Sequence, residues 1–236
     1  MLDIIGGIAI VGLVAILAGV LTGAAGVSPR HRLTAFVGLG VWVALLIAAS
    51  VLGWFDPGAV GPVPTIAYPL AAVLAAGLVS WFRVPRFRER VRAMPLPVLI
   101  AANIGRVLGV FFLVLYGVGR VPAPFAQSAG WGDIVVGTLA LPLAVMAAAG
   151  SARPLWIGLW NAFGMLDLVT AVALGVLSSP GTPFRVFGSG SAPFAVTALP
   201  WVLIPTFLVP VYFLVHLAIA ARLRAPGAVG REPVTA

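Results

Sequence analysis

Six residues whose side chains could do chemistry lie inside otherwise apolar stretches of this sequence. They are Asn103, Arg106, Asp133, Asn161, Asp167 and His216. An ionisable side chain within a bilayer costs about 2.5–3.5 kcal/mol on insertion scales, so each is expected either to serve a ligand or to pair with another buried group. The arginine fork suits a carboxylate or phosphate, whereas aspartate and histidine can carry protons.

Spacing and estimated depth relate these residues to one another. Asn103 and Arg106 are three residues apart and share one face of a helix. Asn161 and Asp167 are six apart, about 240° round a helix, so they join one site only if their helix lies between two neighbours. Arg106 and Asp167 are expected at mid-membrane, and the two asparagines and His216 in the inner half.

We therefore expect Asn103, Arg106, Asn161, Asp167 and His216 to form a ligand-binding site. In this interpretation Arg106 anchors a small polar or anionic solute, Asp167 is its counter-ion, and the asparagines supply hydrogen bonds. Two alternatives stay open for the same residues. Arg106 and Asp167 could form a purely structural ion pair, or they could couple to protons or ions.

Asp133 has a simpler explanation in the sequence. It follows Gly132 at the expected start of a helix, where an acidic side chain stabilises the free N–H groups and the helix dipole.

His216 does not predict haem, because bis-histidine haem needs a second histidine and His31 is expected in a loop.

Missing residue types exclude several kinds of chemistry. All fourteen basic residues are arginine, so there is no lysine for a retinal or pyridoxal Schiff base. The absence of cysteine excludes thiol catalysis and thiolate metal sites. No metal-binding, nucleophile or phosphate-binding motif is present. The sequence predicts no cofactor, no metal and no nucleic-acid partner, and it favours a protein without enzymatic activity.

The composition shows what must position these polar groups. Hydrophobic residues make up 61% and charged residues 8% of the 236, whereas a soluble domain carries about 25% charged residues. Seven stretches reach the roughly 20 apolar residues that cross a bilayer: 4–27, 33–54, 64–82, 96–118, 131–150, 155–177 and 197–221. The first is too long for the apolar core of a signal peptide, so we expect it to be retained.

We therefore predict an all-α integral membrane protein with seven transmembrane helices. Residues 1–224 would form one domain and 225–236 a short flexible cytoplasmic tail. Segments 1–3 and 5–7 show weak similarity at an offset of 123–125 residues, which is compatible with a 3+1+3 parallel repeat about the fourth segment.

The arginines predict the orientation. Eleven fall in alternate connections and the C-terminal tail, against two, Arg120 and Arg185, on the opposite side. The positive-inside rule then places the N-terminus outside and the C-terminus in the cytoplasm. Arginine in place of lysine, with abundant Ala, Gly and Pro, is typical of GC-rich bacterial genomes. We expect a multi-pass protein of the bacterial cytoplasmic membrane.

The loop at 83–95 carries five arginines and one glutamate, Glu89. It could bind anionic lipid headgroups at the bilayer surface, or act only as a topology signal.

Two further functions compete with solute transport. One is an enzyme that acts on a lipid or quinone with Asp133, Asp167 or His216 as acid or base. The other is a sensor or assembly protein that binds a partner at this loop.

Overall fold

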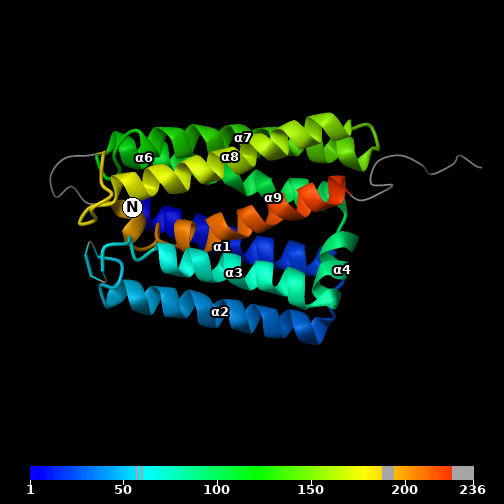
Figure 1. The fold of residues 1–236 in the computed structure, drawn as a ribbon, viewed down its shortest axis with the longest axis horizontal. Coiled ribbons are helices and arrows are strands. Elements are labelled where there is room, and N and C mark those ends of the chain that lie inside the picture. The colour runs from blue at the N-terminus through cyan, green and yellow to red at the C-terminus, as the bar shows by residue number, and fades with distance from the viewer. Residues whose placement is uncertain (57, 60, 188–193, 225–236) are drawn as a thin grey trace, which may run out of the picture.

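The protein is a bundle of helices lying side by side (Figure 1). The structure, a computed structural model, describes residues 1–56, 58–59, 61–187 and 194–224, and it contains no strand within these ranges. Six helical runs are long and apolar enough to cross a membrane: Leu2–Ala24, Pro29–Val51, Leu96–Gly117, Phe125–Ala148, Pro154–Ser178 and Ile204–Leu223. The predicted all-helical membrane protein is confirmed at this level.

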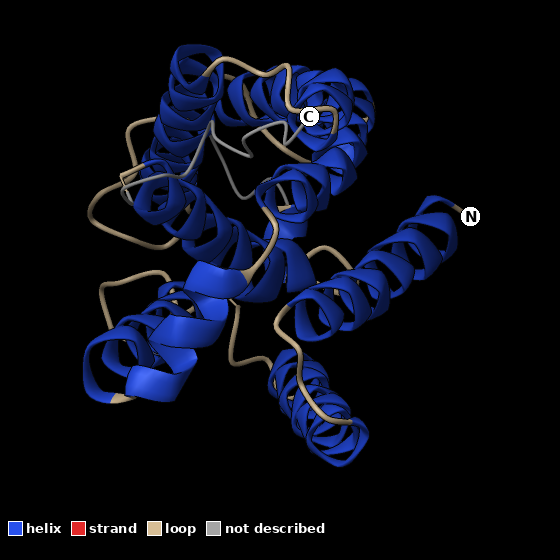
Figure 2. Cartoon of the chain, turned by 90° about the vertical axis from the view of Figure 1, so that its right-hand side faces the viewer, coloured by secondary structure: helices blue, strands red, loops and turns tan. Residues whose placement is uncertain are grey.

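The helices are joined by short connections, and α5, η1 and α6 form one continuous run, as do η3 and α9. Their bounds are α1 Leu2–Ala24, α2 Pro29–Val51, α3 Ala67–Arg83, α4 Pro85–Ala93, α5 Leu96–Ala101, η1 Ala102–Gly109, α6 Val110–Gly117, α7 Phe125–Ala148, α8 Pro154–Ser178, η2 Ala195–Thr197, η3 Ile204–Leu208 and α9 Val209–Leu223. Seen from the α4 end in Figure 2, most of them lie nearly end-on.

The third expected span is shorter than a full crossing. Helix α3 has 17 residues, or about 25 Å at 1.5 Å per residue. The chain then bends by 100° into α4. Val84 is extended there, with φ −114° and ψ 94°, because a residue before proline disfavours the helical region and Pro85 follows. Among the described residues, six helices are therefore long and apolar enough to span a membrane, or up to seven if the bent pair is one span.

Large apolar side chains face outward on the peripheral helices. Ile8 of α1, Leu33 of α2 and Val51 of α2 are 71%, 68% and 74% exposed, and α2 buries only Leu46. Water would strongly disfavour such a surface, whereas lipid would not. These surfaces are consistent with contact with a lipid bilayer.

The arginine-rich elements lie together at one end of the bundle. The start of α2, the short helix α4, the start of α8 and the end of α9 are all at the right of Figure 1, whereas the N-terminus is at the left. This arrangement agrees with the alternation expected from the sequence. Which end faces the cytoplasm stays a prediction, as does the 3+1+3 repeat. The expected tail at 225–236 lies outside the described residues.

Two expected boundaries are wrong. Helix α7 begins at Phe125, directly after Pro124, and not near position 131. The last span begins at Ile204 rather than at position 197, because residues 195–202 form the short 3₁₀ helix η2, a bend and turns. The backbone also departs from α geometry at two interior points. Segment η1 is a 3₁₀ helix of eight residues, and η3, which contains Pro205, is a π-helix.

Candidate functional site

Arg106, on η1 in the centre of the bundle, holds two carboxylates. Its Nε donates to Oδ1 of Asp133 on α7 at 2.6 Å, and its Nη2 donates to Oδ2 of Asp167 on α8. The Arg106 side chain is completely buried, at 0% exposure. The expected contact between Arg106 and Asp167 is therefore present. Asp133, which the sequence offered only as the next candidate partner after Asp167, is a second partner.

A histidine and an asparagine extend this cluster. Nη1 of Arg106 lies 3.0 Å from Nε2 of His216 on α9. The other ring nitrogen of His216, Nδ1, lies 2.9 Å from Oδ1 of Asn161 on α8. A guanidinium can only donate, so Nε2 must accept. Assigned in this way, Nδ1 carries the proton and donates to Asn161, and the imidazole is neutral. Five side chains from four spans thus form one network, the Arg106 cluster: Arg106, Asp133, Asn161, Asp167 and His216.

Gly164 explains how Asn161 and Asp167 join one site. Asn161, Gly164 and Asp167 are spaced three apart on α8, so they span an arc of only about 120° with the glycine at its centre. The Gly164 carbonyl accepts from Nη1 of Arg106 at 3.2 Å. A β-carbon there would lie 2.5 Å from Cε1 of His216. Asn161 and Asp167 are thus separated by about 240° in one direction round the helix but by only about 120° in the other, and this smaller arc faces Arg106.

Two further glycines make room for the carboxylates. A β-carbon at Gly132 would collide with the carboxylate of Asp167, and one at Gly109 would collide with Cβ of Asp133. Glycine therefore lets η1, α7 and α8 approach closely enough for short ion pairs.

Asn103 does not contact the Arg106 cluster. Its Nδ2 donates to the Leu99 carbonyl of its own helical run at 3.2 Å. Its Oδ1 is buried and has no hydrogen-bond partner among the described residues. The shared face expected for Asn103 and Arg106 thus does not bring both side chains to the same partners.

The expected helix-end role of Asp133 is wrong. Because α7 begins at Phe125, Asp133 is in the helix interior, two turns from the N-terminus. Pro122 and Pro124, just before this helix, are the signal that could have moved the expected boundary. The first free N–H groups then fall near position 125, and Asp133 needs another partner, which is Arg106.

The charges of the Arg106 cluster do not balance. One guanidinium faces two carboxylates, and His216 accepts from the guanidinium. With both carboxylates ionised, the cluster carries one excess negative charge. Exposure is unequal: 0% for the Arg106 side chain, 7% for Asp167 and 18% for Asp133. Asp133 is the charged group of the cluster that is most open to its surroundings.

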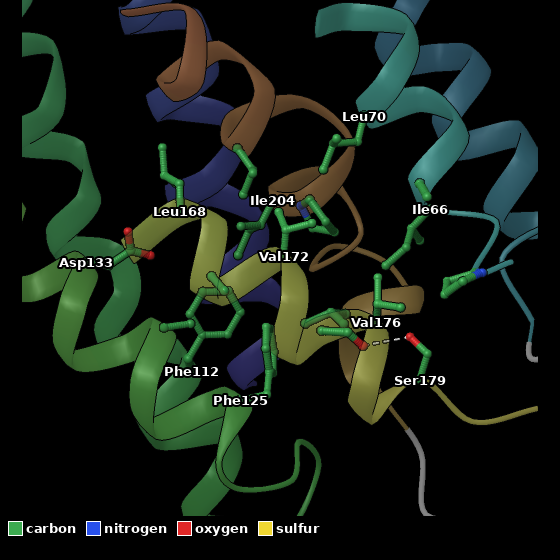
Figure 3. Close-up of a pocket in the computed structure, with 18 residues that line it drawn as sticks. Ile66, Leu70, Phe112, Phe125, Asp133, Leu168, Val172, Val176, Ser179 and Ile204 are labelled. Atoms are coloured by element: carbon green, nitrogen blue, oxygen red, sulfur yellow. Dashed lines mark hydrogen bonds between the residues drawn. The ribbon is translucent and has the colours of Figure 1, made fainter. Parts of the chain in front are cut away.

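A cavity of about 90 Å³ adjoins Asp133. It lies among α3, α6, α7, α8 and η3, with Ile66 and Ser179 toward one end and Asp133 at the other (Figure 3). Side chains such as Leu70, Phe112 and Val172 form apolar walls. Asp133 is the charged side chain among the described residues that line it. The Ser179 hydroxyl is occupied, because it donates to the Gly175 carbonyl at 2.8 Å.

A second cavity, of about 30 Å³, shares Phe112, Asp133, Leu168, Ile204 and Val209 with the first. Tyr212 and Arg106 also line it. The Tyr212 hydroxyl is buried without a hydrogen-bond partner in the described part of the chain. Its ring centroid lies 5.7 Å from the guanidinium carbon of Arg106. The two cavities therefore meet at Asp133, and the smaller one is lined by a tyrosine whose hydroxyl has no hydrogen-bond partner among the described residues.

The described residues contain no group of three His, Cys, Asp or Glu side chains that could hold a metal ion.

Comparison with known proteins gives one match. The model of the family described as "Domain of unknown function (DUF8737)" matches residues 63–224, a range that contains every member of the Arg106 cluster. No curated protein and no solved structure matches the chain.

Proposed function

The chain belongs to the DUF8737 family, and we propose that it binds a small polar solute at the Arg106 cluster and moves it across the bacterial cytoplasmic membrane. In this proposal the N-terminus lies outside and the arginine-rich end lies in the cytoplasm. The observation that carries the proposal is the position of Asp133. It belongs to the buried ionic network and also lines the cavity of about 90 Å³.

The roles within the cluster follow from which groups are already occupied. Arg106 makes four hydrogen bonds to Asp133, Asp167, Gly164 and His216, and a guanidinium has five N–H groups. Only one N–H, on Nη2, is left, so an anion that made more than a single hydrogen bond to Arg106 would have to replace one of these acceptors. We therefore assign Arg106, with Asp167, His216 and Asn161, to the frame that holds Asp133, and Asp133 to the solute. Asn103 lines neither cavity, so its Oδ1, which has no hydrogen-bond partner among the described residues, is given no contact with the solute in this proposal.

Two backbone features support movement as well as binding. The 3₁₀ segment η1 carries Arg106, and the π-helical segment η3 lines both cavities through Ile204. Such segments have poorer backbone hydrogen bonds than an α-helix and are frequent at hinges and functional sites. Prolines 205 and 210 cannot donate backbone hydrogen bonds at the η3–α9 junction. In our proposal, α9 changes its bend at this junction when solute passes.

One observation also favours a second candidate function. The larger cavity is almost entirely apolar, which suits the tail of a lipid or quinone. The protein would then be a membrane-embedded enzyme with Asp133 as acid or base. Chemical turnover of a labelled lipid or quinone by the purified protein, lost in Asp133→Asn, would favour this candidate over transport.

A binding screen tests the proposed function. The purified full chain would be heated in detergent with a panel of amines, amino acids, carboxylates and sugars, and its unfolding temperature recorded. We expect at least one solute to raise the unfolding temperature by mass action, and Asp133→Asn to abolish the rise. Asp56→Asn, in an exposed loop, is the matched control and should keep it. The proposal fails if no solute stabilises the folded protein in a manner that depends on Asp133.

A further inference from the structure

The geometry points to the chemical class of the ligand: we infer that the cavity at Asp133 takes a small amphipathic amine, with its ammonium group on the Asp133 carboxylate and its apolar body in the cavity of about 90 Å³. This inference rests on the proposed function, because it places the solute at the same site. It gives the solute a positive charge, whereas the sequence led us to expect a small polar or anionic solute anchored by Arg106.

The sign of the ligand charge follows from the charge count. Arg106 is paired with both Asp133 and Asp167, so one of the two carboxylates lacks a full counter-charge. His216 does not supply it, because its Nε2 accepts from Arg106. Uncompensated charge is strongly disfavoured inside a bilayer. An ammonium group at Asp133, the carboxylate that reaches the cavity, would make the assembly neutral.

The side chains that line the larger cavity indicate that the ligand carries an apolar body. The larger cavity is lined by aliphatic and aromatic side chains from α3, α6, α7, α8 and η3, and Figure 3 shows Leu168, Val172 and Phe125 directed into it. An inorganic cation or a sugar would lose its hydration there without replacement hydrogen bonds. An apolar body of about three to four carbons suits this volume, since a cavity of about 150 Å³ holds benzene, and such a body gains from burial.

Tyr212 is a second, independent indication of a polar ligand group. Its side chain is only 4% exposed. Its hydroxyl finds no partner among the described residues, and it lines the smaller cavity that meets the larger one at Asp133. A buried polar group without a partner is rare. A phenol oxygen can accept a hydrogen bond from an ammonium group, which has several donors to share between Asp133 and Tyr212.

Three matched probes of one shape test the inference. They are 3-fluoropropylamine, which is cationic at neutral pH, the neutral 3-fluoropropan-1-ol and the anionic 3-fluoropropanoate. Binding to the purified full chain in detergent would be followed by fluorine NMR. We expect the amine to bind about tenfold or more tightly than the other two, because only it can form an ion pair as well as a hydrogen bond with a carboxylate. Asp133→Asn should remove this preference.

A second pair of variants keeps the test decisive if Asp133→Asn does not fold. Ala171→Phe fills the larger cavity from α8, one turn after Asp167, whereas Ala173→Phe adds the same ring at an exposed position of the same helix. Amine binding should be lost in the first variant and kept in the second.

The outcomes separate this inference from the proposed function. Equal binding of amine and alcohol, tighter binding of the propanoate, or amine binding that survives Ala171→Phe would each overturn the inference. If the amine fails but another solute stabilises the protein in a manner that depends on Asp133, the proposed function stands and the inference falls. If nothing depends on Asp133, both fall.

Discussion

Gly164 of α8 contacts the imidazole of His216 of α9 so closely that a β-carbon at position 164 would lie 2.5 Å from Cε1 and 2.7 Å from Nε2. The same β-carbon would be 3.3 Å from Nη1 of Arg106. The hydrogen bonds from Arg106 to the Gly164 carbonyl and to His216 therefore depend on the absence of a side chain at this one position.

This relationship gives the first prediction. Gly164→Ala should displace His216 and Arg106 and destabilise the fold by about 1–3 kcal/mol, the usual effect of overpacking a core. The measurement is the unfolding temperature of the purified protein in detergent. Gly158→Ala, on the same helix with nothing within 4 Å of the added carbon, is the control and should be neutral or slightly stabilising. Equal effects of the two substitutions would contradict the packing described here.

A second prediction concerns the ionic network. Removing one partner of a buried ion pair typically costs about 3–5 kcal/mol, because the other charge is left unpaired. Arg106→Gln strands both Asp133 and Asp167 and should lower the folded yield more than Asp167→Asn does. Arg106→Gln with Asp167→Asn should recover only part of the yield.

The triple variant, with Asp133→Asn added, completes this test. It leaves no ionised group in the cluster, so we expect it to recover more folded protein than the double variant. Folded yield by size-exclusion chromatography is the readout. Additive losses across the series would show that the three residues do not interact.

Depth and helical spacing predicted part of the site. Counting residues from the expected membrane surface placed Arg106 level with Asp167, and His216 level with Asn161. Both pairs are in hydrogen-bond contact. The depth estimate succeeded for these pairs because apolar helices of similar length cross the same hydrocarbon layer. The position of a residue in its helix then converts to depth at about 1.5 Å per residue.

Asp133 could not be placed in the same way. Its depth depends on where α7 begins, and the helix extends back to Phe125 through a polar, weakly hydrophobic turn, Gln127–Ser128. Asn103 shows a different limit. Its helical face was predicted from its spacing to Arg106, but its amide donates to Leu99 within the same run. A choice between local and distant partners is decided by tertiary packing.

The third prediction tests the orientation. The chain has no native cysteine, so single cysteines can be introduced cleanly. Ala59→Cys in the α2–α3 connection should react with an impermeant maleimide on intact cells, whereas Glu89→Cys and Ser151→Cys should react only after the cells are permeabilised. All three positions are exposed. The reverse pattern would invert the proposed topology.

A fourth prediction contrasts an exposed ion pair with the buried network. Arg120 donates to Asp3 at 2.8 Å, and the two side chains are 31% and 49% exposed. Exposed pairs contribute about 0–1 kcal/mol. Arg120→Gln should therefore shift the unfolding temperature far less than Arg106→Gln. The two variants would be measured in the same detergent, and comparable shifts would contradict the assigned burial.

The central claim is that Asp133 makes a reachable cavity electrostatically negative, and a thiol-modification rate tests it most directly. Ala129 lines the larger cavity one turn before Asp133 on α7. In Ala129→Cys, the cationic reagent aminoethyl methanethiosulfonate should react about tenfold or more faster than the anionic sulfonatoethyl reagent, after correction for their rates at Ala59→Cys, because a nearby carboxylate in a low-dielectric site attracts the cation. Asp133→Asn in the same background should remove that preference. Equal rates, a faster anionic reagent, or no reaction with either would contradict the account.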